Sequence, residues 1–238
     1  MGESPRFTRI LLKLSGESLM GPGQYGIDPG TVEFIAKQIK KLHDTGIQIG
    51  IVIGGGNIFR GLNAAENGMD RVAGDYMGML ATILNSLALK DQLNRQEISA
   101  RVMSALRMDT VTEFYIRNKA VSHLEEGKVV IMAAGTGNPY FTTDTAAALR
   151  AVEVGADVVM KGTRVDGVYD ADPEKVPDAK IYDEITYDTV LAKHLKVMDA
   201  TAIALCRENK IPILVFNMTK EGNLYRAGTG EHIGTLVH

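Results

Sequence analysis

The sequence contains no tryptophan, only one cysteine and no strong excess of charge of either sign. A single cysteine, Cys206, rules out an intrachain disulfide and a thiolate metal cluster. It lies in the apolar run 202–206, where a buried small side chain is the simpler interpretation and a nucleophile the alternative. The net charge of −3 argues against nucleic acid as a partner, because proteins that bind it usually present a strongly basic face.

Segments that direct a protein to a membrane are also missing. Residues 1–9 (MGESPRFTR) contain no apolar core of a signal peptide, and no stretch approaches the ~20 apolar residues of a membrane span. The five histidines are scattered without an HExxH or other paired spacing, so neither a metalloenzyme nor a histidine-based triad is supported. We expect a cytoplasmic protein without a membrane partner.

The two common nucleotide-binding fingerprints are absent as well. No GxxxxGK[ST] occurs, which excludes a P-loop enzyme. The run GGGNIFRG at 54–61 does not fit GxGxxG, because Phe59 occupies the position of the last glycine. A Rossmann dehydrogenase is therefore disfavoured.

Strand-like apolar runs alternate with helix-period segments, which is typical of an α/β fold with a mostly parallel sheet and crossover helices. The segment 163–181 is rich in Asp, Gly and Pro, and its VDGV sequence predicts a hairpin. The change of character near residue 160 predicts two lobes of one folding unit. The predicted strands are 9–14, 47–53, 98–103, 128–133, 156–160 and 212–216, with an edge strand at 234–237, and the predicted helices are 31–43, 72–93, 143–154 (N-cap Thr143), 187–195 and 199–208.

Four of the predicted strands end in glycine-bearing turns, at 14–16, 53–57, 134–138 and 161–163. Open α/β sheets bind ligands at the carboxyl ends of their strands. Glycine has no Cβ, so phosphate oxygens can approach its backbone N–H closely. The alternative is that each glycine only supplies a positive φ in a tight loop. Three consecutive glycines at 54–56 favour phosphate binding, because their ordering costs much conformational entropy.

Two lysines stand at the ends of predicted strands: Lys13 interrupts an apolar run and Lys161 follows another. A lysine in a buried strand is unusual unless its ammonium reaches a carboxylate, a ligand or water. The alternative is an edge-strand lysine that extends to solvent. Two cations on one phosphate chain would stabilise phosphoryl transfer. Asp144 and Asp199 begin predicted helices, where they can orient these lysines or act as ordinary caps.

The segment 135–143 (GTGNPYFTT) combines threonines, an amide, a proline and two aromatic side chains in one predicted loop. Such a mixture suits a small ligand with a phosphate and a flat ring, and binding residues concentrate on loops. Anchoring of the loop on the core is the alternative. The helix over 75–93 is apolar around much of its circumference, which fits either a core helix or a subunit interface.

Several motifs together resemble the bacterial uridylate kinases of the amino acid kinase superfamily. The motifs are KLSGE (13–17), IGGGNIFRG (53–61), GDYMGM (74–79), AGTGNPYFTTDTAA (134–147), KGTRVDGVYDADP (161–173) and VMDATA (197–202). The GTGNPYFTTD stretch is specific for this group, whereas KLSG and GGGN identify only the superfamily. The resemblance implies a three-layer αβα fold in a single domain, 1–238, with the acceptor side mainly in 1–160 and the nucleotide side mainly in 161–238. It also implies that ATP, with Mg²⁺, phosphorylates UMP to UDP in pyrimidine nucleotide biosynthesis.

The resemblance carries site residues over to matching positions. On the ATP side these are Lys13, Leu14, Ser15, Gly16, Gly56, Arg60, Thr163, Tyr169 and Asp172. On the UMP side they are Gly55, Asp75, Thr136, Gly137, Asn138, Pro139, Tyr140, Phe141, Thr142 and Thr143. Our mechanistic hypothesis makes Lys13, Lys161, Asp144 and Asp199 the catalytic group, with Asp144 or Asp199 holding a lysine and Arg60 clamping a phosphate. Asp75 would read the ribose hydroxyls, and no direct protein ligand of Mg²⁺ is assigned.

The resemblance further implies a homohexamer that GTP activates and UTP inhibits. The segment Gly21, Pro22, Gly23, Gln24, Tyr25 and Gly26 matches an activator segment, and Lys90, Asp91 and Arg101 are candidates for the same site. Some relatives have a histidine and a tryptophan near that site, where this chain has Asn94 and no tryptophan. This departure weakens the expectation of activation by GTP and leaves the expectation of catalysis unchanged.

Other functions on the same fold remain alternatives. A kinase for a carboxylate or carbamate is disfavoured, because the chain has no appended regulatory domain of an aspartokinase and its GTGNPYFTTD loop does not suit an acetylglutamate kinase. A non-catalytic nucleotide sensor or oxoanion-binding protein belongs to a different class. The presence of both Lys13 and Lys161 argues against it, since pure binding does not require both.

Overall fold

The structure is a computed structural model that describes residues 7–59 and 68–238. Its centre is one sheet in the order β4-β3-β5-β2-β1-β6-β8-β9-β7. Neighbouring strands are parallel, except for the antiparallel pair β8 and β9. The strands are β1 (Arg9–Leu14), β2 (Gln48–Ile53), β3 (Ala100–Ser104), β4 (Glu113–Phe114), β5 (Val129–Ala133), β6 (Val158–Thr163), β7 (Glu184–Ile185), β8 (Ile213–Asn217) and β9 (Thr235–Val237).

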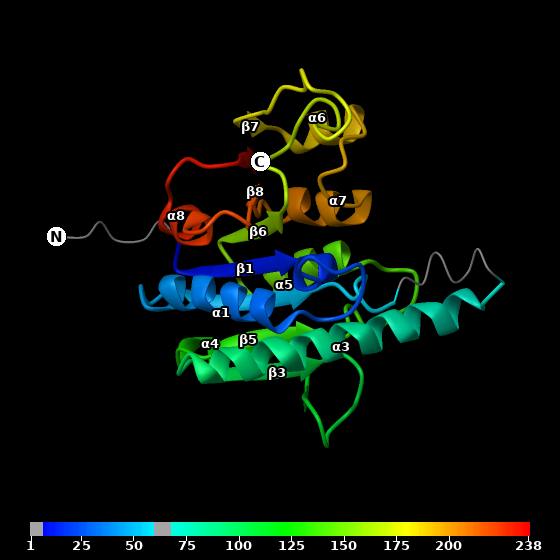
Figure 1. Ribbon diagram of the computed structural model, residues 1–238, viewed down its shortest axis with the longest axis vertical. Coiled ribbons are helices and arrows are strands. Elements are labelled where there is room, and N and C mark those ends of the chain that lie inside the picture. The colour runs from blue at the N-terminus through cyan, green and yellow to red at the C-terminus, as the bar shows by residue number, and fades with distance from the viewer. Residues whose placement is uncertain (1–6, 60–67) are drawn as a thin grey trace.

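Helices cover both faces of this sheet and make three layers (Figure 1). One face packs against α1 (Pro29–His43), α3 (Arg71–Arg95) and α8 (Asn223–Thr229). The other packs against α4 (Arg117–Glu125), α5 (Thr143–Val154), α6 (Tyr187–Ala192) and α7 (Ala200–Glu208). A short 3₁₀ helix, η1 (Gly16–Leu19), follows β1. The predicted fold class, a mostly parallel sheet between helices, is confirmed.

Alternation along the central strands decides which side chains face which layer. In β1, Ile10, Leu12 and Leu14 belong to the core under α1 and α3, whereas Leu11 belongs to the core under α5. Lys13 follows the alternation of Leu11 and therefore faces the α5 layer. Val159 and Lys161 occupy the same face in β6. The two lysines thus share one face of the sheet.

Local signals explain how α1 and α5 begin. Asp28 caps α1 by accepting a hydrogen bond from the Thr31 N–H at 2.7 Å, and Pro29 follows it at the first helical position, so the helix starts two residues before the predicted 31. In α5 the cap is Thr142, which accepts from the backbone N–H groups of Asp144 and Thr145, so the prediction of Thr143 as N-cap is wrong.

Some predicted elements differ from the structure because tertiary contacts override local patterns. Residues 164–167 form bends and no hairpin: Asp166 accepts from the Asn217 amide at 3.0 Å and pairs with Lys220 at 2.6 Å. Strand β6 continues to Thr163, so Lys161 lies inside a strand and not after it. The strand at 234–237 exists as β9 but lies between β8 and β7, so it is not an edge strand.

The sequence pattern did not predict β4, β7, α4, α8 or η1. These elements have two to nine residues, and α4 buries only Ala120 and Leu124, which leaves little periodicity to detect. Helix α6 ends at Ala192, three residues before the prediction, and His194 then adopts a positive φ of 51°. Cys206 is fully buried in α7, and burial raises the pKa of its thiol to about 12, which agrees with a structural role.

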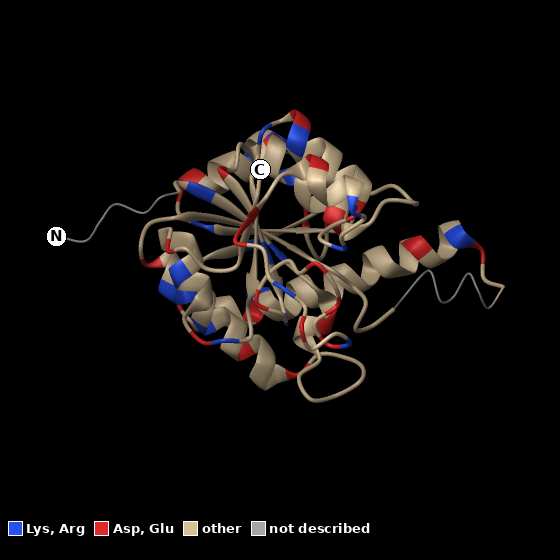
Figure 2. Ribbon diagram, turned by 90° about the horizontal axis from the view of Figure 1, so that it is seen from above, with Lys and Arg blue, Asp and Glu red and all other residues tan. Residues whose placement is uncertain are grey.

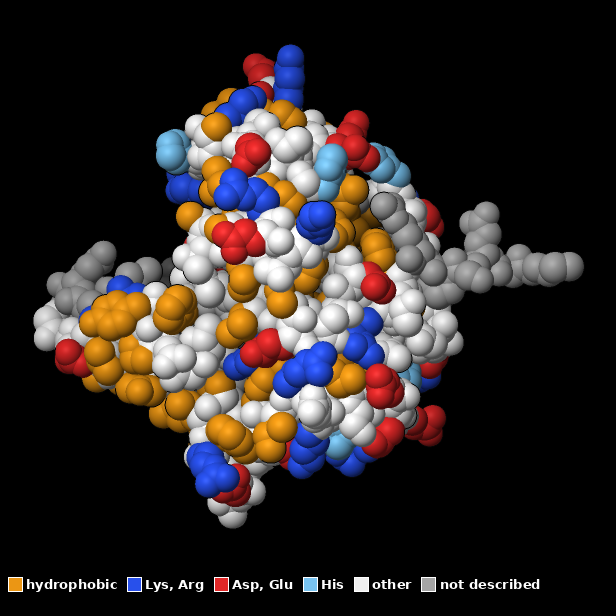
Figure 3. Space-filling model, turned by 180° about the vertical axis from the view of Figure 1, so that it is seen from behind, with side chains coloured by type: hydrophobic (Ala, Val, Ile, Leu, Met, Phe, Trp, Pro, Cys, Tyr) orange, Lys and Arg blue, Asp and Glu red, His pale blue; other side chains and the backbone are white. Residues whose placement is uncertain are grey.

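Helix α3 has two different faces and projects beyond the rest of the fold at its N-terminal end (Figure 2). Among the described residues it alone is long and apolar enough to cross a membrane, with a hydropathy of 1.2, although the sequence predicts no such segment. Its inner face packs on the sheet, as a core helix does. Its outer face exposes Tyr76, Met77, Leu80 and Leu84, and hydrophobic side chains gather on this projecting part (Figure 3).

Candidate functional site

The glycine-bearing turns meet at the carboxyl edge of the sheet, after β1, β2 and β5. A Cβ on Gly16 would lie 2.6 Å from the Gly54 carbonyl oxygen and 2.8 Å from the Gly56 nitrogen. The backbones after β1 and β2 therefore touch, and the Gly54 N–H donates to the Leu14 carbonyl at 2.9 Å. Only glycine permits this approach at position 16, which brings two predicted phosphate-binding turns together.

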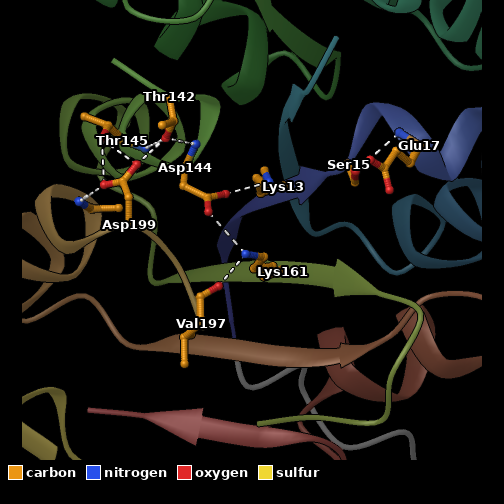
Figure 4. Close-up of polar contacts among 10 residues, drawn as sticks. Lys13, Ser15, Glu17, Thr142, Asp144, Thr145, Lys161, Val197 and Asp199 are labelled. Atoms are coloured by element: carbon orange, nitrogen blue, oxygen red, sulfur yellow. Dashed lines mark hydrogen bonds and ion pairs between the residues drawn. The ribbon is translucent and has the colours of Figure 1, made fainter. Parts of the chain in front are cut away.

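Lys13 and Lys161 lie side by side at this edge. They are register partners on the neighbouring central strands β1 and β6. Asp144, in the first turn of α5, lies between them, with its Oδ1 2.5 Å from Lys13 Nζ and its Oδ2 3.2 Å from Lys161 Nζ (Figure 4). The three side chains are 9%, 16% and 17% exposed. This excludes the interpretation of the lysines as edge-strand residues that extend to solvent.

The charges of this lysine–aspartate cluster control its protonation. Burial favours the neutral acid, yet the ammonium groups of Lys13 and Lys161 hold the pKa of Asp144 below 3.8. Burial and the charge of Lys13 lower the pKa of Lys161, while Asp144 opposes this effect. Two ammonium groups and one carboxylate have a net positive charge, which can attract the anionic oxygens of a phosphoryl group.

Of the two residues predicted to hold a lysine, Asp144 contacts both lysines, whereas Asp199 makes its hydrogen bonds to other groups. It caps α7 by accepting from the Ala202 N–H at 2.8 Å, and it accepts hydrogen bonds from the hydroxyls of Thr145, at 2.9 Å, and Thr142 (Figure 4). Among the described residues it forms no ion pair with either lysine, and it acts on Lys161 only as a minor attraction. The Lys161 ammonium donates instead to the Val197 carbonyl. Asp199 thus joins the starts of α5 and α7.

A small cavity of about 150 Å³ is lined by the loop that directly precedes Asp144, by the turn after β2 and by α3. Six of the predicted UMP-binding residues line it: Gly55, Asp75, Thr136, Phe141, Thr142 and Thr143. Gly137, Asn138, Pro139 and Tyr140 belong to the same loop but do not line the cavity. Asp75 pairs with the Arg71 guanidinium at 2.9 Å and accepts from the Tyr140 N–H at 2.7 Å. The structure therefore brings the acceptor-side residues into one region.

A larger cavity of about 560 Å³ adjoins Lys161 on the other side. It is lined by Thr163, Tyr169 and Asp172, as predicted for the ATP side, and by apolar side chains such as Val168 and Leu195. Lys193, His194 and Lys196 also line it, and the sequence analysis did not assign them a role. The basic run KHLK (193–196) just before VMDATA is the signal that indicates them.

The remaining predicted residues are placed as follows. Leu14, Ser15, Gly16 and Gly56 lie at the contact of the first two turns, and Arg60 lies outside the described residues. Gly21–Gly26 follow η1 at the carboxyl edge, where the Gly26 N–H donates to the Asn57 carbonyl at 2.8 Å. Arg101 stands near the start of β3, and Lys90 and Asp91 stand near the end of α3, which leads into β3.

Three buried polar residues that the sequence pattern did not indicate bond to the loops beside the small cavity. Thr82 accepts from the Ala134 N–H at 2.8 Å, and Asn85 donates to the Gly54 carbonyl at 2.7 Å. Arg150, from α5, donates to the Gly135 carbonyl at 3.3 Å. The sequence signal that could have indicated these three residues is the occurrence of polar side chains within the apolar helical segments 82–86 and 143–154.

The described residues contain no group of three or more His, Cys, Asp or Glu side chains placed to hold a metal ion. Both oxygens of Asp144 face ammonium groups. This donor set fits Mg²⁺ that is bound mainly by phosphate oxygens and water, a common arrangement for this ion.

The family model described as amino acid kinase family matches residues 8–217. The chain is 61% identical to the uridylate kinase of Phocaeicola vulgatus and 58% identical to that of Bacteroides thetaiotaomicron, each over 98% of this chain and 99% of the relative. The crystal structure of UMP kinase from Bacillus anthracis matches with a TM-score of 0.94 at 40% identity, over 98% of this chain and 96% of that one. The protein is thus a member of the amino acid kinase family.

Proposed function

We propose that the protein transfers the γ-phosphoryl group of ATP to UMP and produces UDP and ADP in the cytoplasm. The observation that carries this proposal is the buried cluster of Lys13, Asp144 and Lys161. Lys161 lines the larger cavity, and Asp144 directly follows Thr143, which lines the smaller one. The names of the relatives supply the acceptor, since those proteins are uridylate kinases. The acceptor side lies mainly in residues 1–160 and much of the nucleotide side in residues 161–238.

The mechanism requires charge screening and alignment rather than a general base. The second pKa of a phosphate monoester is about 6, so the UMP phosphate is already a nucleophilic anion at neutral pH. Lys13 and Lys161 would offset the charge on the transferring group, and Asp144 keeps both ammonium groups in place. Mg²⁺ would neutralise phosphate charge while held mainly by ATP and water.

The two cavities suit the two nucleotides. The larger one has a mixed lining that includes apolar side chains such as Val168 and Leu195, which could contact a purine ring, and it reaches Lys161, where the phosphates of ATP would end. The smaller one is bordered by the exposed aromatic side chain of Phe141, which can stack on uracil. Asp75 would exchange part of its contact with Arg71 or Tyr140 for the ribose hydroxyls. In this proposal Arg60 clamps a phosphate as a bidentate donor.

The release of ADP should depend on the acceptor that is offered. With UMP we expect ADP formation on the order of 100-fold faster than with CMP, because a site that hydrogen-bonds uracil leaves groups unpaired against cytosine. Acetylglutamate and buffer without acceptor should give only background. A coupled assay with the same enzyme and these four conditions measures the effect. ADP release that UMP does not stimulate would contradict the proposal and favour a nucleotide sensor.

We further propose that copies of the chain assemble through the outer face of α3, and that the assembly is a hexamer. Tyr76, Met77, Leu80 and Leu84 expose 41% to 52% of their surfaces on this one face, and contiguous exposed apolar patches mark interaction sites. GTP and UTP are the proposed activator and inhibitor.

Charge on that face should disrupt the assembly. Leu84→Lys places an ammonium in the apolar face, and we expect the oligomer to dissociate into smaller species. Tyr225→Lys on α8 is the matched control, since Tyr225 is 41% exposed but lies on another element. Sedimentation velocity of both variants and the wild type gives the masses. Unchanged mass in Leu84→Lys would place the interface elsewhere.

A further inference from the structure

Two buried asparagine side chains form a reciprocal amide pair beneath the glycine turns. Asn57 Nδ2 donates to Asn85 Oδ1 at 2.9 Å, and Asn85 Nδ2 donates to Asn57 Oδ1 at 2.7 Å. Their exposed fractions are 2% and 0%. Each Nδ2 makes a second bond, from Asn57 to the Gly26 carbonyl at 2.8 Å and from Asn85 to the Gly54 carbonyl at 2.7 Å. All four amide hydrogens of this asparagine pair are therefore used.

The asparagine pair joins segments from both sides of the site. Gly54 opens the glycine run that continues into Gly55, on the acceptor side. Gly16 belongs to the predicted ATP side, which is the phosphoryl donor side. It packs directly against the pair, because a Cβ there would lie 2.6 Å from Asn57 Oδ1. Gly26 is bound twice, since its N–H also donates to the Asn57 carbonyl at 2.8 Å. The turn after β1 and the turn after β2 thus both contact the asparagine pair. All amide hydrogens of this pair are hydrogen-bonded, and Asn85 connects it to α3.

We infer that Asn85 is a positioning residue that sets the placement of the donor-side turn relative to the acceptor-side turn. The inference rests on the proposed phosphoryl transfer. Asn85 bonds to the Gly54 carbonyl and acts on Gly16 through Asn57. The buried apolar residues Ile83 and Leu89 of α3 already pack in the core, so packing of α3 on the sheet does not in itself require an amide at position 85. A fully satisfied buried network instead specifies one arrangement of the segments that it joins.

The kinetic consequence follows from the need to align two anionic groups. A displacement of about 1 Å between reacting groups can cost on the order of 100-fold in rate. Each turn keeps its own backbone N–H groups when the asparagine pair is broken, so each nucleotide still binds. Loss of the pair should therefore lower kcat more than it raises either KM.

The test compares Asn85→Ala with Ser86→Ala. Ser86 is equally buried on α3, but its hydroxyl donates to the Thr82 carbonyl within the same helix at 2.7 Å. Both variants lose buried polar contacts, and both are assayed well below the unfolding midpoints measured by circular dichroism. For Asn85→Ala we expect kcat to fall roughly 30- to 100-fold, with the KM values for ATP and UMP within about threefold of wild type. Ser86→Ala should keep kcat within about threefold of wild type.

The inference is overturned if Asn85→Ala keeps kcat within about threefold of wild type or loses no more than Ser86→Ala. If Asn85→Ala does not fold, Asn85→Leu replaces it, because leucine fills a similar volume without restoring the amide bonds. A folded Asn85→Leu with wild-type kcat would contradict the inference equally. Wild-type ADP release with UMP is measured in the same series. Its absence would refute the proposed function itself, whereas an active wild type with an equally fast Asn85 variant refutes only the positioning role.

Discussion

Replacement of Lys161 by methionine should lower kcat with UMP about 1,000-fold while the fold is preserved. Methionine retains most of the aliphatic stem but removes the ammonium that pairs with Asp144, on a residue that also lines the larger cavity. Groups that stabilise developing phosphoryl charge contribute rate factors on the order of 10² to 10⁵. Steady-state kinetics with varied ATP and UMP measures the loss.

The matched control is Lys37→Met on α1. Lys37 is also a paired lysine, with Glu33 at 2.6 Å, but its side chain is 55% exposed on the surface of a helix. We expect its kcat to stay within about twofold of wild type, since exposed ion pairs contribute little. If Lys161→Met turned over as fast as Lys37→Met, the lysines would not be acting on the transferring group.

Asp144→Asn should destabilise the fold by about 3 kcal/mol and also slow turnover. The carboxylate separates two ammonium groups on adjacent strands, and removal of one member of a buried ion pair leaves uncompensated charge. The pKa of Asp144 in the folded protein lies below its ordinary value of 3.8, so its contribution is present above about pH 4 and is lost as the pH falls through the lower, folded-state pKa. Urea unfolding at pH 7 therefore measures the full effect.

The double variant Asp144→Asn with Lys161→Met isolates the cause of the Asp144 effect. Removal of one ammonium relieves the repulsion, so the double variant should be more stable than Asp144→Asn alone. Its turnover should not recover, since a lysine is also lost. If the double variant were less stable by the sum of the two single changes, Asp144 would contribute through packing and not through charge.

The sequence was sufficient to predict features that depend on local pattern. Apolar runs predicted the central strands, and glycine predicted where backbones meet, as at Gly16 and Gly54. The choice between Asp144 and Asp199 was beyond local pattern, because both residues stand at helix starts. That choice depends on which helix start lies beside the neighbouring strands β1 and β6. These strands are far apart in the sequence, so a short sequence segment does not show that they are neighbours. The VDGV turn failed for a related reason, since Asn217 and Lys220 hold Asp166 from a distant part of the chain.

The sequence also did not predict the buried α3 residues Thr82 and Asn85 that bond to the backbone after β5 and β2. Thr82 and Asn85 appear in the sequence as ordinary polar interruptions of an apolar helix. Their role depends on which strand ends lie beneath α3, and that is a property of the crossover connections. Arg150 also bonds to a loop, through the Gly135 carbonyl. Local pattern did not indicate this bond, because it depends on how the loop before α5 folds back toward its own helix.

The register of Lys13 with Lys161 has a mechanical consequence. The two lysines come from distant parts of the sequence, and five register pairs join their strands β1 and β6. A slip of one residue would turn one lysine to the opposite face of the sheet. The backbone hydrogen bonds between β1 and β6 therefore fix the positions of the two lysines relative to each other. We therefore expect closure around the nucleotides to come from movement of the loops at the carboxyl edge and not from a shift of β1 against β6.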